Sequence, residues 1–176
     1  MFRILILTLF LITPFASAKQ TEQLAQITNF HFVNDDLASA GLPKPEQLKL
    51  LKDYGFQHVI NLIPGVQLKE KRKVQQLGMT FEQIKVDWHN PTLENFKQFV
   101  ALMEQYKDDK VFVHCQLNWR ASTFVYLYRI TQLKIDKQQA VKDLVAIWQP
   151  EERWQSFIDE TLKHYARSDS SIRSAQ

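Results

Sequence analysis

Residues 110–120 read Lys-Val-Phe-Val-His-Cys-Gln-Leu-Asn-Trp-Arg, and they give the clearest indication of the fold. The β-branched and aromatic run over 110–114 predicts a short strand that leads directly into Cys115. From Arg120 to Leu133 almost every residue is apolar or aromatic, which predicts a helix enclosed on most sides rather than a surface helix. We therefore expect a strand, a tight turn that carries Cys115, and a buried helix in succession.

Strand and helix patterns alternate on both sides of this stretch. The strand-like runs are residues 30–33, 57–62 and 79–86. Helical patterns begin after Leu42 and cover residues 68–77. Three more begin after Thr92, Asp136 and Pro150, and N-cap or first-turn residues mark these starts. The alternation predicts an α/β fold with a mainly parallel central sheet flanked by helices and with a helical C-terminal part.

Length and composition limit the classes of function. A chain of 176 residues with 45% hydrophobic content can bury one core. The formal net charge is +3, and the densest basic cluster, residues 69–73, has the pattern of a solvated helix face. We therefore expect one domain and no nucleic-acid partner.

The first eighteen residues have the pattern of a signal peptide. Met1-Phe2-Arg3 supplies a positive start, residues 4–12 are almost wholly apolar, and Ala16-Ser17-Ala18 suits a signal peptidase. The alternative is a retained membrane anchor, for which the apolar run is short. We expect cleavage before Lys19, an exported protein without a stable membrane span, and a periplasmic location in a Gram-negative source. An N-terminal segment would then cover 19–29, the α/β domain 30–167, and a loose polar tail 168–176.

Cys115 is the single cysteine of the chain, so it cannot form an internal disulfide. The thiol is either an inert buried group or a reactive one. The histidines, which could compete for it as ligands of a metal, lack the paired spacing of zinc sites; they are His31, His58, His89, His114 and His164. We expect neither a metal nor a cofactor.

The sequence predicts a site for an anion at this turn. The preceding strand ends in His-Cys, and the following helix begins with Arg. Backbone N–H groups of the turn and the helix N-terminus both favour negative charge, and therefore also the thiolate form of Cys115. Arg120 offers a planar fork of donors for two phosphoryl oxygens. The expected loop residues are His114, which would orient the loop, and Gln116, Leu117, Asn118 and Trp119. Because the loop lacks glycine, we expect either that Asn118 accepts an unusual backbone conformation or that the loop is more open.

The stretch Val113-His114-Cys115 followed by Arg120 resembles the signature loop of the cysteine-dependent protein tyrosine and dual-specificity phosphatase superfamily. Residues 38–48, Gly55-Phe56 and residues 59–62 are similar to a bacterial branch of it, the phosphatase-like domain that is also fused to β-lactamase-like hydrolases. The resemblance covers residues 30–154. It implies hydrolysis of phosphate monoesters through a phosphocysteine on Cys115, and a substrate that is a phosphorylated small molecule or a phosphoprotein.

Within this resemblance, two further residues receive roles. Four residues separate Cys115 from Arg120 where the superfamily usually has five, as in the bacterial branch, and Ser122 keeps the superfamily offset of a hydroxyl that donates to the thiolate. Asp87 begins a loop that resembles the acid-bearing segment of the superfamily, so it is the candidate general acid, with His89 as the substitute. The alternative for Asp87 is a carboxylate that only caps the backbone.

Two other classes of function stay open. The four-residue spacing also occurs in rhodanese-type sulfurtransferases, in which a cysteine carries a persulfide. A non-catalytic anion-binding module would use the same loop without turnover. Whichever class holds, we expect a monomer.

Overall fold

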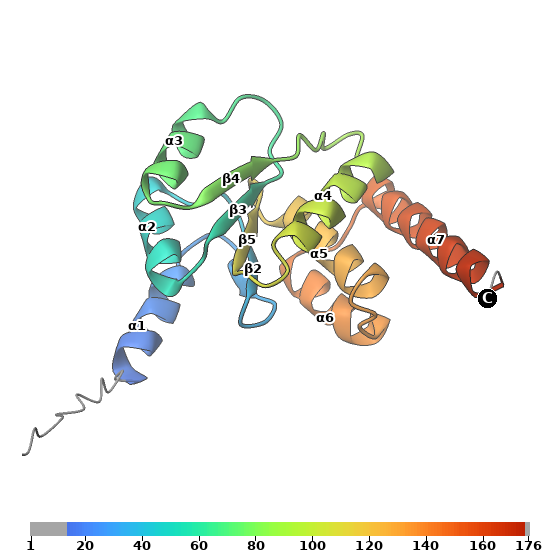
Figure 1. The fold of residues 1–176 in the computed structure, drawn as a ribbon, viewed down its shortest axis with the longest axis horizontal. Helices are drawn as coiled ribbons and strands as arrows, with labels where there is room; N and C mark the ends of the chain where they lie inside the picture. The colour runs from blue at the N-terminus through green and yellow to red at the C-terminus, as the bar shows by residue number, and fades with distance from the viewer. Residues whose placement is uncertain (1–13, 175–176) are drawn as a thin grey trace, which may run out of the picture.

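The computed structural model describes residues 14–174 and the side chains of residues 19–167. A five-stranded sheet in the order β1-β2-β5-β3-β4 forms its centre (Figure 1). Only the edge pair of β1 and β2 is antiparallel, and the other three pairs are parallel. The strands are β1 His31–Phe32, β2 Leu37–Ala40, β3 His58–Asn61, β4 Thr80–Gln83 and β5 Val111–His114. The expected mainly parallel α/β fold is confirmed.

Seven helices cover the two faces of the sheet in the described part of the chain (Figure 1). One face packs against α1 Pro14–Leu24, α2 Pro45–Tyr54 and α3 Leu68–Gln76. The other face packs against α4 Leu93–Gln105, α5 Trp119–Thr131, α6 Lys137–Ile147 and α7 Glu152–Ser174. The helical C-terminal part expected from the sequence is therefore present.

Local sequence explains where the helices begin and end. Pro45 opens α2, and Gly55 ends it with a φ of 106°, a conformation that glycine adopts without strain. The Thr92 hydroxyl caps α4 by accepting from the Asn95 N–H at 3.1 Å. Asp136 caps α6 in the same way, accepting from the N–H groups of Gln138 and Gln139.

Helix α5 lies in the middle of the larger core. All of its residues from Ala121 to Arg129 are buried, as the mostly apolar run predicts. It packs against α6 and α7 on one side and the sheet on the other. Because β5 leads into α5, the turn between them is held by both layers of the domain.

The structure differs from the sequence-based expectations at three places. Strand β2, which has the sequence Leu-Ala-Ser-Ala, was not expected, and it pairs with the central strand β5. The segment 19–29 is packed into the fold, since Leu24 and Ile27 are almost wholly buried. At the other end α7 continues to Ser174, so the expected loose tail begins as helix.

The expected signal peptide lies largely outside the described residues. Helix α1 begins at Pro14 and runs across the expected cleavage position before Lys19. Cleavage therefore stays a prediction. Within residues 14–174, no helix combines the length and apolar character that crossing a membrane requires.

Candidate active site

Cys115 lies at the carboxyl end of β5, between β2 and β3 in the middle of the sheet. Its N–H donates to the carbonyl of Ala40 at 3.3 Å, which fixes the point where the chain leaves the sheet. The side chain is only 1% exposed, yet it lines a cavity together with Arg120. The sulfur and the guanidinium side chain are thus brought together, as expected.

The turn after Cys115 depends on Asn118. This residue is the N-cap of α5 and has a φ of 67°, in the left-handed region that asparagine tolerates better than most residues. Its Nδ2 donates to the carbonyl of Asn29 at 2.7 Å, and the Asn29 Nδ2 donates back to the carbonyl of Leu117 at 3.0 Å. The expected conformation of Asn118 is confirmed, and the N-terminal segment holds the loop in place.

Gly41 allows the same segment to approach the loop closely. Its N–H donates to the Thr28 carbonyl at 2.7 Å, and the N–H of Leu42 donates to the Gln116 carbonyl at 3.2 Å. A Cβ at position 41 would lie 2.8 Å from the Thr28 Cβ and 2.9 Å from the Gln116 carbonyl oxygen. Only glycine fits here without displacing the loop.

Arg120 and two tryptophans form the walls of the cavity beside the sulfur. The cavity has a volume of about 210 Å³ and is lined by Trp88, Cys115, Gln116, Leu117, Trp119 and Arg120. The guanidinium carbon lies 5.6 Å from the ring centre of Trp88, a cation–π contact. Its Nε is buried and has no hydrogen-bond partner among the described residues. An unpaired buried donor beside a thiol suits an anionic ligand.

All four tryptophans of the chain gather at this cavity. Trp119 stacks on Trp148 with ring centres 5.3 Å apart, and Trp88 contacts Trp154 at 5.1 Å. The indole N–H of Trp154 donates to the Trp88 carbonyl at 3.2 Å. Helix α7 therefore fixes the tryptophan that contacts Arg120, a link that residue patterns do not reveal.

Asp87 lies next to this cavity in sequence but not among the residues that line it. Its carboxylate is exposed and accepts from the backbone N–H of His89 at 2.8 Å, so it caps its own loop. His89 is also exposed, and its carbonyl accepts from Arg153 of α7 at 2.7 Å. The Asp87 carboxylate thus caps the backbone of its loop and also remains exposed to solvent.

Ser122 does not lie at the cavity with Cys115. Its hydroxyl donates to the Trp119 carbonyl one turn earlier at 3.1 Å, and its side chain lines a separate small cavity under α6. The expected hydrogen bond from Ser122 to the thiolate is therefore wrong for this structure. A hydroxyl in a helix interior often bonds to the carbonyl three or four residues back, and that local partner wins here.

His114 points to the opposite face of the sheet from Cys115, towards α3. Its Nε2 lies 2.6 Å from Oε1 of Glu70, and Oε2 of Glu70 accepts from Nδ2 of Asn61 at 2.6 Å. Sequence reasoning missed Glu70 because it lies in the charged run 69–73. Its position four residues before the buried Val74 was the available signal, since residues four apart share a helix face.

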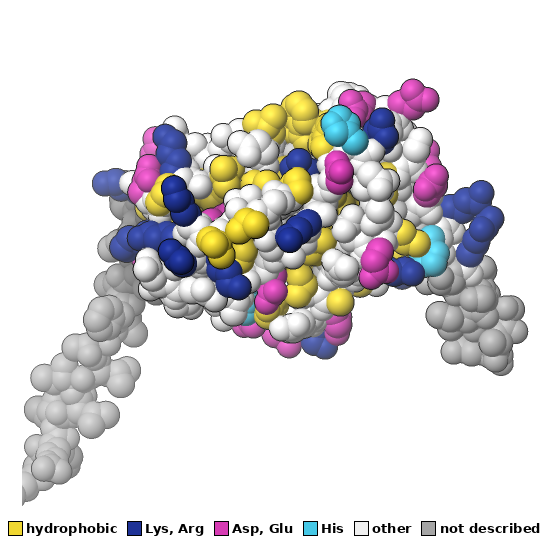
Figure 2. All heavy atoms as spheres, turned by 90° about the horizontal axis from the view of Figure 1, so that it is seen from above, with side chains coloured by type: hydrophobic (Ala, Val, Ile, Leu, Met, Phe, Trp, Pro, Cys, Tyr) yellow, Lys and Arg dark blue, Asp and Glu magenta, His cyan; other side chains and the backbone are white. Residues whose placement is uncertain are grey.

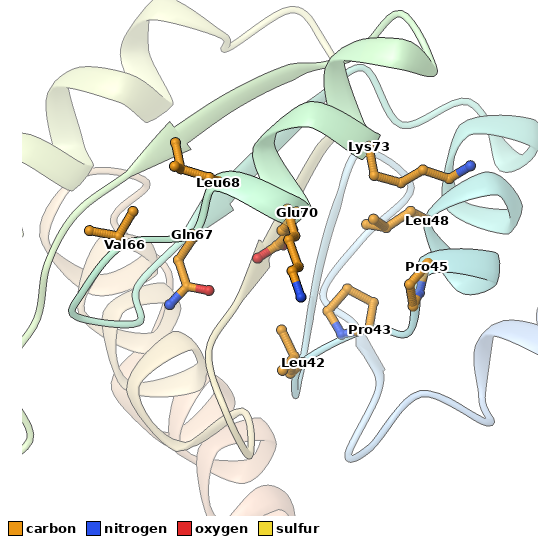
Figure 3. A pocket seen from close by; sticks show the side chains of 10 residues that line it. Leu42, Pro43, Pro45, Leu48, Val66, Gln67, Leu68, Glu70 and Lys73 are labelled. Atoms are coloured by element: carbon orange, nitrogen blue, oxygen red, sulfur yellow. The ribbon is translucent and has the colours of Figure 1, made fainter.

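The rest of the described surface offers a larger cavity but no metal centre. A cavity of about 490 Å³ lies between α2, α3 and the loop that ends at Pro45 (Figure 3). Figure 2 shows Lys and Arg side chains gathered at the end of the molecule that α2 and α3 occupy, in agreement with a solvated basic helix face at 69–73. Within residues 14–174, no three His, Cys, Asp or Glu side chains cluster as metal ligands.

Comparisons with known proteins show which family this chain resembles. Residues 23–161 match the family described as DSP-PTPase phosphatase fused to NAD+ kinase. The chain is 36% identical to the DUF442 protein of Shewanella putrefaciens CN-32, with a TM-score of 0.73 over 82% of this chain and 97% of that one. No curated protein matches.

Two more distant structures share the fold. One is the core catalytic domain of the PP-IP phosphatase SIW14 of S. cerevisiae, at 16% identity and a TM-score of 0.64 over 81% of this chain and 93% of that one. The other is TpbA of P. aeruginosa, at 17% identity and a TM-score of 0.64 over 79% and 91%. The expected superfamily is thus confirmed, whereas the expected fusion to β-lactamase-like hydrolases stays a prediction.

Proposed function

This chain belongs to the family described as DSP-PTPase phosphatase fused to NAD+ kinase, and from that premise we propose that it hydrolyses phosphate monoesters through a phosphocysteine on Cys115. The observation that carries the proposal is the shared cavity of Cys115 and Arg120 at the N-terminus of α5. The buried Nε of Arg120, without a partner in the described part of the chain, supplies a donor for a phosphoryl oxygen. The family supports hydrolysis over sulfur transfer.

The reaction proceeds in two displacements at phosphorus. The Cys115 thiolate attacks, the S–P bond forms, and the P–O ester bond breaks so that the alcohol leaves with its electron pair and takes up a proton. Water then attacks the phosphocysteine, the S–P bond breaks, and inorganic phosphate and the thiolate are released together with the proton of the water. Arg120 and the N–H groups at the start of α5 stabilise the negative oxygens in both steps.

We assign the proton for the leaving group to Asp87. The residue directly precedes Trp88, a wall of the cavity, and its exposed carboxylate belongs to the loop at the rim of the site. Its hydrogen bond from the His89 N–H uses Oδ1, which leaves Oδ2 for the proton. His89 is the substitute from the same loop.

The walls of the cavity favour an aromatic ester. Trp88 and Trp119 both line the cavity beside the sulfur, with ring centres 5.6 Å apart, and such ring surfaces pack against a planar ring. The proposed substrates are therefore aryl phosphates, either phosphotyrosine in a protein or a small phosphorylated compound.

The test is steady-state hydrolysis of para-nitrophenyl phosphate by the mature chain. We expect Cys115→Ser to lower kcat/KM roughly a thousandfold or more and Arg120→Lys to lower it about a hundredfold, since Lys has no planar fork. Glu46→Gln, on the exposed first turn of α2, is the matched control and should leave it unchanged.

Three outcomes would overturn the proposal. Equal hydrolysis by the wild type and Cys115→Ser would exclude the nucleophile. Transfer of sulfur from thiosulfate to cyanide that depends on Cys115, without hydrolysis of any phosphate ester, would assign the chain to the sulfurtransferases. Binding of phosphate without turnover would instead identify an anion-binding module.

We also propose that the protein is exported. The support is the order of the positive start, the apolar run and the small residues before Lys19. Mass spectrometry of the protein from its source should show a chain that begins at Lys19, and a chain that retains Met1 would contradict export by cleavage.

A further inference from the structure

Aliphatic side chains are exposed together at the carboxyl edge of the sheet, where the parallel strands β2, β3 and β5 end. Six large hydrophobic residues are exposed in the described part of the chain, and four of them lie on the loops at this edge. Leu42 follows β2, Val66 and Leu68 follow β3, and Leu117 follows β5. Scattered exposed aliphatic residues are ordinary, whereas a group of them marks a contact surface. We call these four residues the apolar patch.

The apolar patch is continuous across the three loops. The backbone of Leu117 pairs with Gly41, the residue before Leu42, in an isolated bridge. Leu42, Val66 and Leu68 line the same cavity of about 490 Å³ (Figure 3). Figure 2 shows hydrophobic side chains exposed beside Lys and Arg side chains on the face that is seen from above. The patch is therefore one surface and not four separate residues.

The loop between β3 and α3 is the most exposed part of the patch. Residues 62–67 contain no charged side chain, and Gly65 turns the chain at the tip with a φ of 85°. A Cβ added at Gly65 would meet no atom within 4 Å, so the tip stands clear of the rest of the protein. The neighbouring Val66 is 75% exposed. An uncharged tip that projects in this way can enter a soft apolar layer, whereas a folded partner would need a matching hollow.

Cations lie beside the apolar patch on α3. Lys69, Arg72 and Lys73 share one helix face, because residues three and four apart are neighbours on a helix, and we call them the basic face. Lys69 and Lys73 line the same cavity as the patch. None of the three has an ion-pair partner among the side chains that the structure describes. Glu70, the acidic residue of this cavity, instead accepts from Nδ2 of Asn61 at 2.6 Å. The positive charge of the basic face is thus left for an external partner.

The combination of charge and shape limits what can cover this surface. A second copy of the chain, placed patch to patch in a symmetric pair, would bring the two basic faces together, and their like charges would repel. Anionic lipid headgroups neutralise the cations, while the hydrocarbon beneath them accepts the aliphatic tips. An anionic bilayer surface therefore satisfies both parts of the surface.

From this geometry we propose that the apolar patch and the basic face dock the protein on the surface of an anionic phospholipid bilayer. The two aliphatic side chains of the loop before α3 enter the headgroup region, and the three cations contact lipid phosphates. Because Leu117 of the patch also lines the cavity of Cys115, the docked protein turns the mouth of that cavity towards the lipid surface. This inference goes beyond the proposed hydrolysis and does not depend on it.

The experiment is co-sedimentation of the mature chain with vesicles of phosphatidylcholine, alone or mixed with phosphatidylglycerol. We expect binding to the mixed vesicles and little binding to phosphatidylcholine alone. Val66→Ser together with Leu68→Ser should lower the partition coefficient by about tenfold or more, because less apolar surface enters the bilayer. Lys69→Gln together with Lys73→Gln should lower it about twentyfold, since each cation near an anionic surface contributes about fivefold.

The matched control carries Lys142→Gln and Val145→Ser on α6, which packs on the opposite face of the sheet from α3. These changes remove one exposed cation and one exposed aliphatic side chain, and the variant should bind like the wild type. All substituted side chains are largely exposed, and an unchanged urea midpoint checks that each variant folds. Inorganic phosphate, added at the concentration of the lipid phosphate, should not displace the protein from the vesicles.

Four results would overturn the inference. The wild type fails to bind the mixed vesicles, or the variant with Val66→Ser and Leu68→Ser binds them as well as the wild type does, which would show adsorption by charge alone. Displacement by inorganic phosphate would assign the basic face to a free anion. Binding of a glutamate-rich peptide through the same residues, without binding to vesicles, would assign the surface to an acidic protein. Vesicle binding needs no turnover, so failure of the proposed hydrolysis would leave these results unchanged.

Discussion

At the scale of single residues, the loop from Cys115 to Arg120 behaves as its chemistry predicts. Asn118 adopts the left-handed conformation that a turn without glycine requires. Arg120 reaches the cavity of the sulfur, and Trp88 holds its guanidinium. What remains to be tested is which group gives the leaving alcohol its proton.

Asp87→Asn tests the general acid. Hydrolysis of an alkyl phosphate should fall about a hundredfold, because a poor leaving group needs the proton. Hydrolysis of para-nitrophenyl phosphate should fall far less, because nitrophenolate leaves without one. The measurement is kcat for the two esters, with Glu46→Gln on the exposed first turn of α2 as the control. An equal loss for both esters would show that Asp87 only caps its loop.

Gly41→Ala tests the close approach of the N-terminal segment to the loop. The added Cβ meets the Thr28 side chain and the Gln116 carbonyl, so the free energy of unfolding should fall by roughly 1–3 kcal/mol and hydrolysis should be lost. Urea denaturation and kcat/KM are the measurements. Adding Thr28→Gly removes one of the two clashes, and it should restore stability in part but not hydrolysis. Full activity in Gly41→Ala would exclude this role.

Some residues could be placed from sequence and others could not. Cys115, Arg120 and Asn118 were placed because the turn between a strand and a helix is a local structure. Ser122 was misplaced, since its hydroxyl has a carbonyl partner within its own helix that spacing alone does not reveal. Glu70 was overlooked because its partners, Asn61 and His114, are distant in sequence.

At the scale of elements, the order of the strands in the sheet depends on pairing between strands that are distant in the sequence. Strands β3 and β5 carry β-branched and aromatic residues and were predicted, and so were all helices from α2 to α7. Strand β2 has small residues with weak β-propensity, and it becomes a strand because it pairs along the whole of β5. Helix propensity likewise gives no indication that α7 supports the site.

Trp154→Phe tests the support that α7 gives to the cavity. The change removes the hydrogen bond to the Trp88 carbonyl and leaves space in a fully buried position, so the free energy of unfolding should fall by roughly 1–3 kcal/mol. Without this hydrogen bond Trp88 is held less firmly, and its contact with Arg120 loosens. The affinity for phosphate should therefore fall by up to roughly tenfold. Calorimetric titration with inorganic phosphate measures this. Arg153→Ala, at the exposed contact to His89, should have a smaller effect, and unchanged binding in Trp154→Phe would contradict the link.

At the scale of the whole molecule, ionisation of buried tyrosines should limit stability at high pH. Burial raises the pKa of Tyr126, Tyr128 and Tyr165, and burial together with a hydrogen bond to Glu82 raises the pKa of Tyr106. The unfolded chain releases these protons near pH 10, while the folded chain still holds them. The free energy of unfolding should therefore decrease as the pH rises above about 10.

Urea denaturation between pH 8 and pH 11 measures this decrease. Tyr126→Phe removes one ionisable group from the core and should make the midpoint depend less on pH than in the wild type. A urea midpoint that stays constant to pH 11 would contradict the effect.

The most direct test of the function is rapid quenching of the wild type with a ³²P-labelled aryl phosphate, followed by mass spectrometric mapping of the labelled peptide. We predict that the label appears on Cys115 within the first turnover and decays as inorganic phosphate is released. Hydrolysis of the ester with no label on Cys115 at any time would contradict a phosphocysteine and the thiolate nucleophile with it.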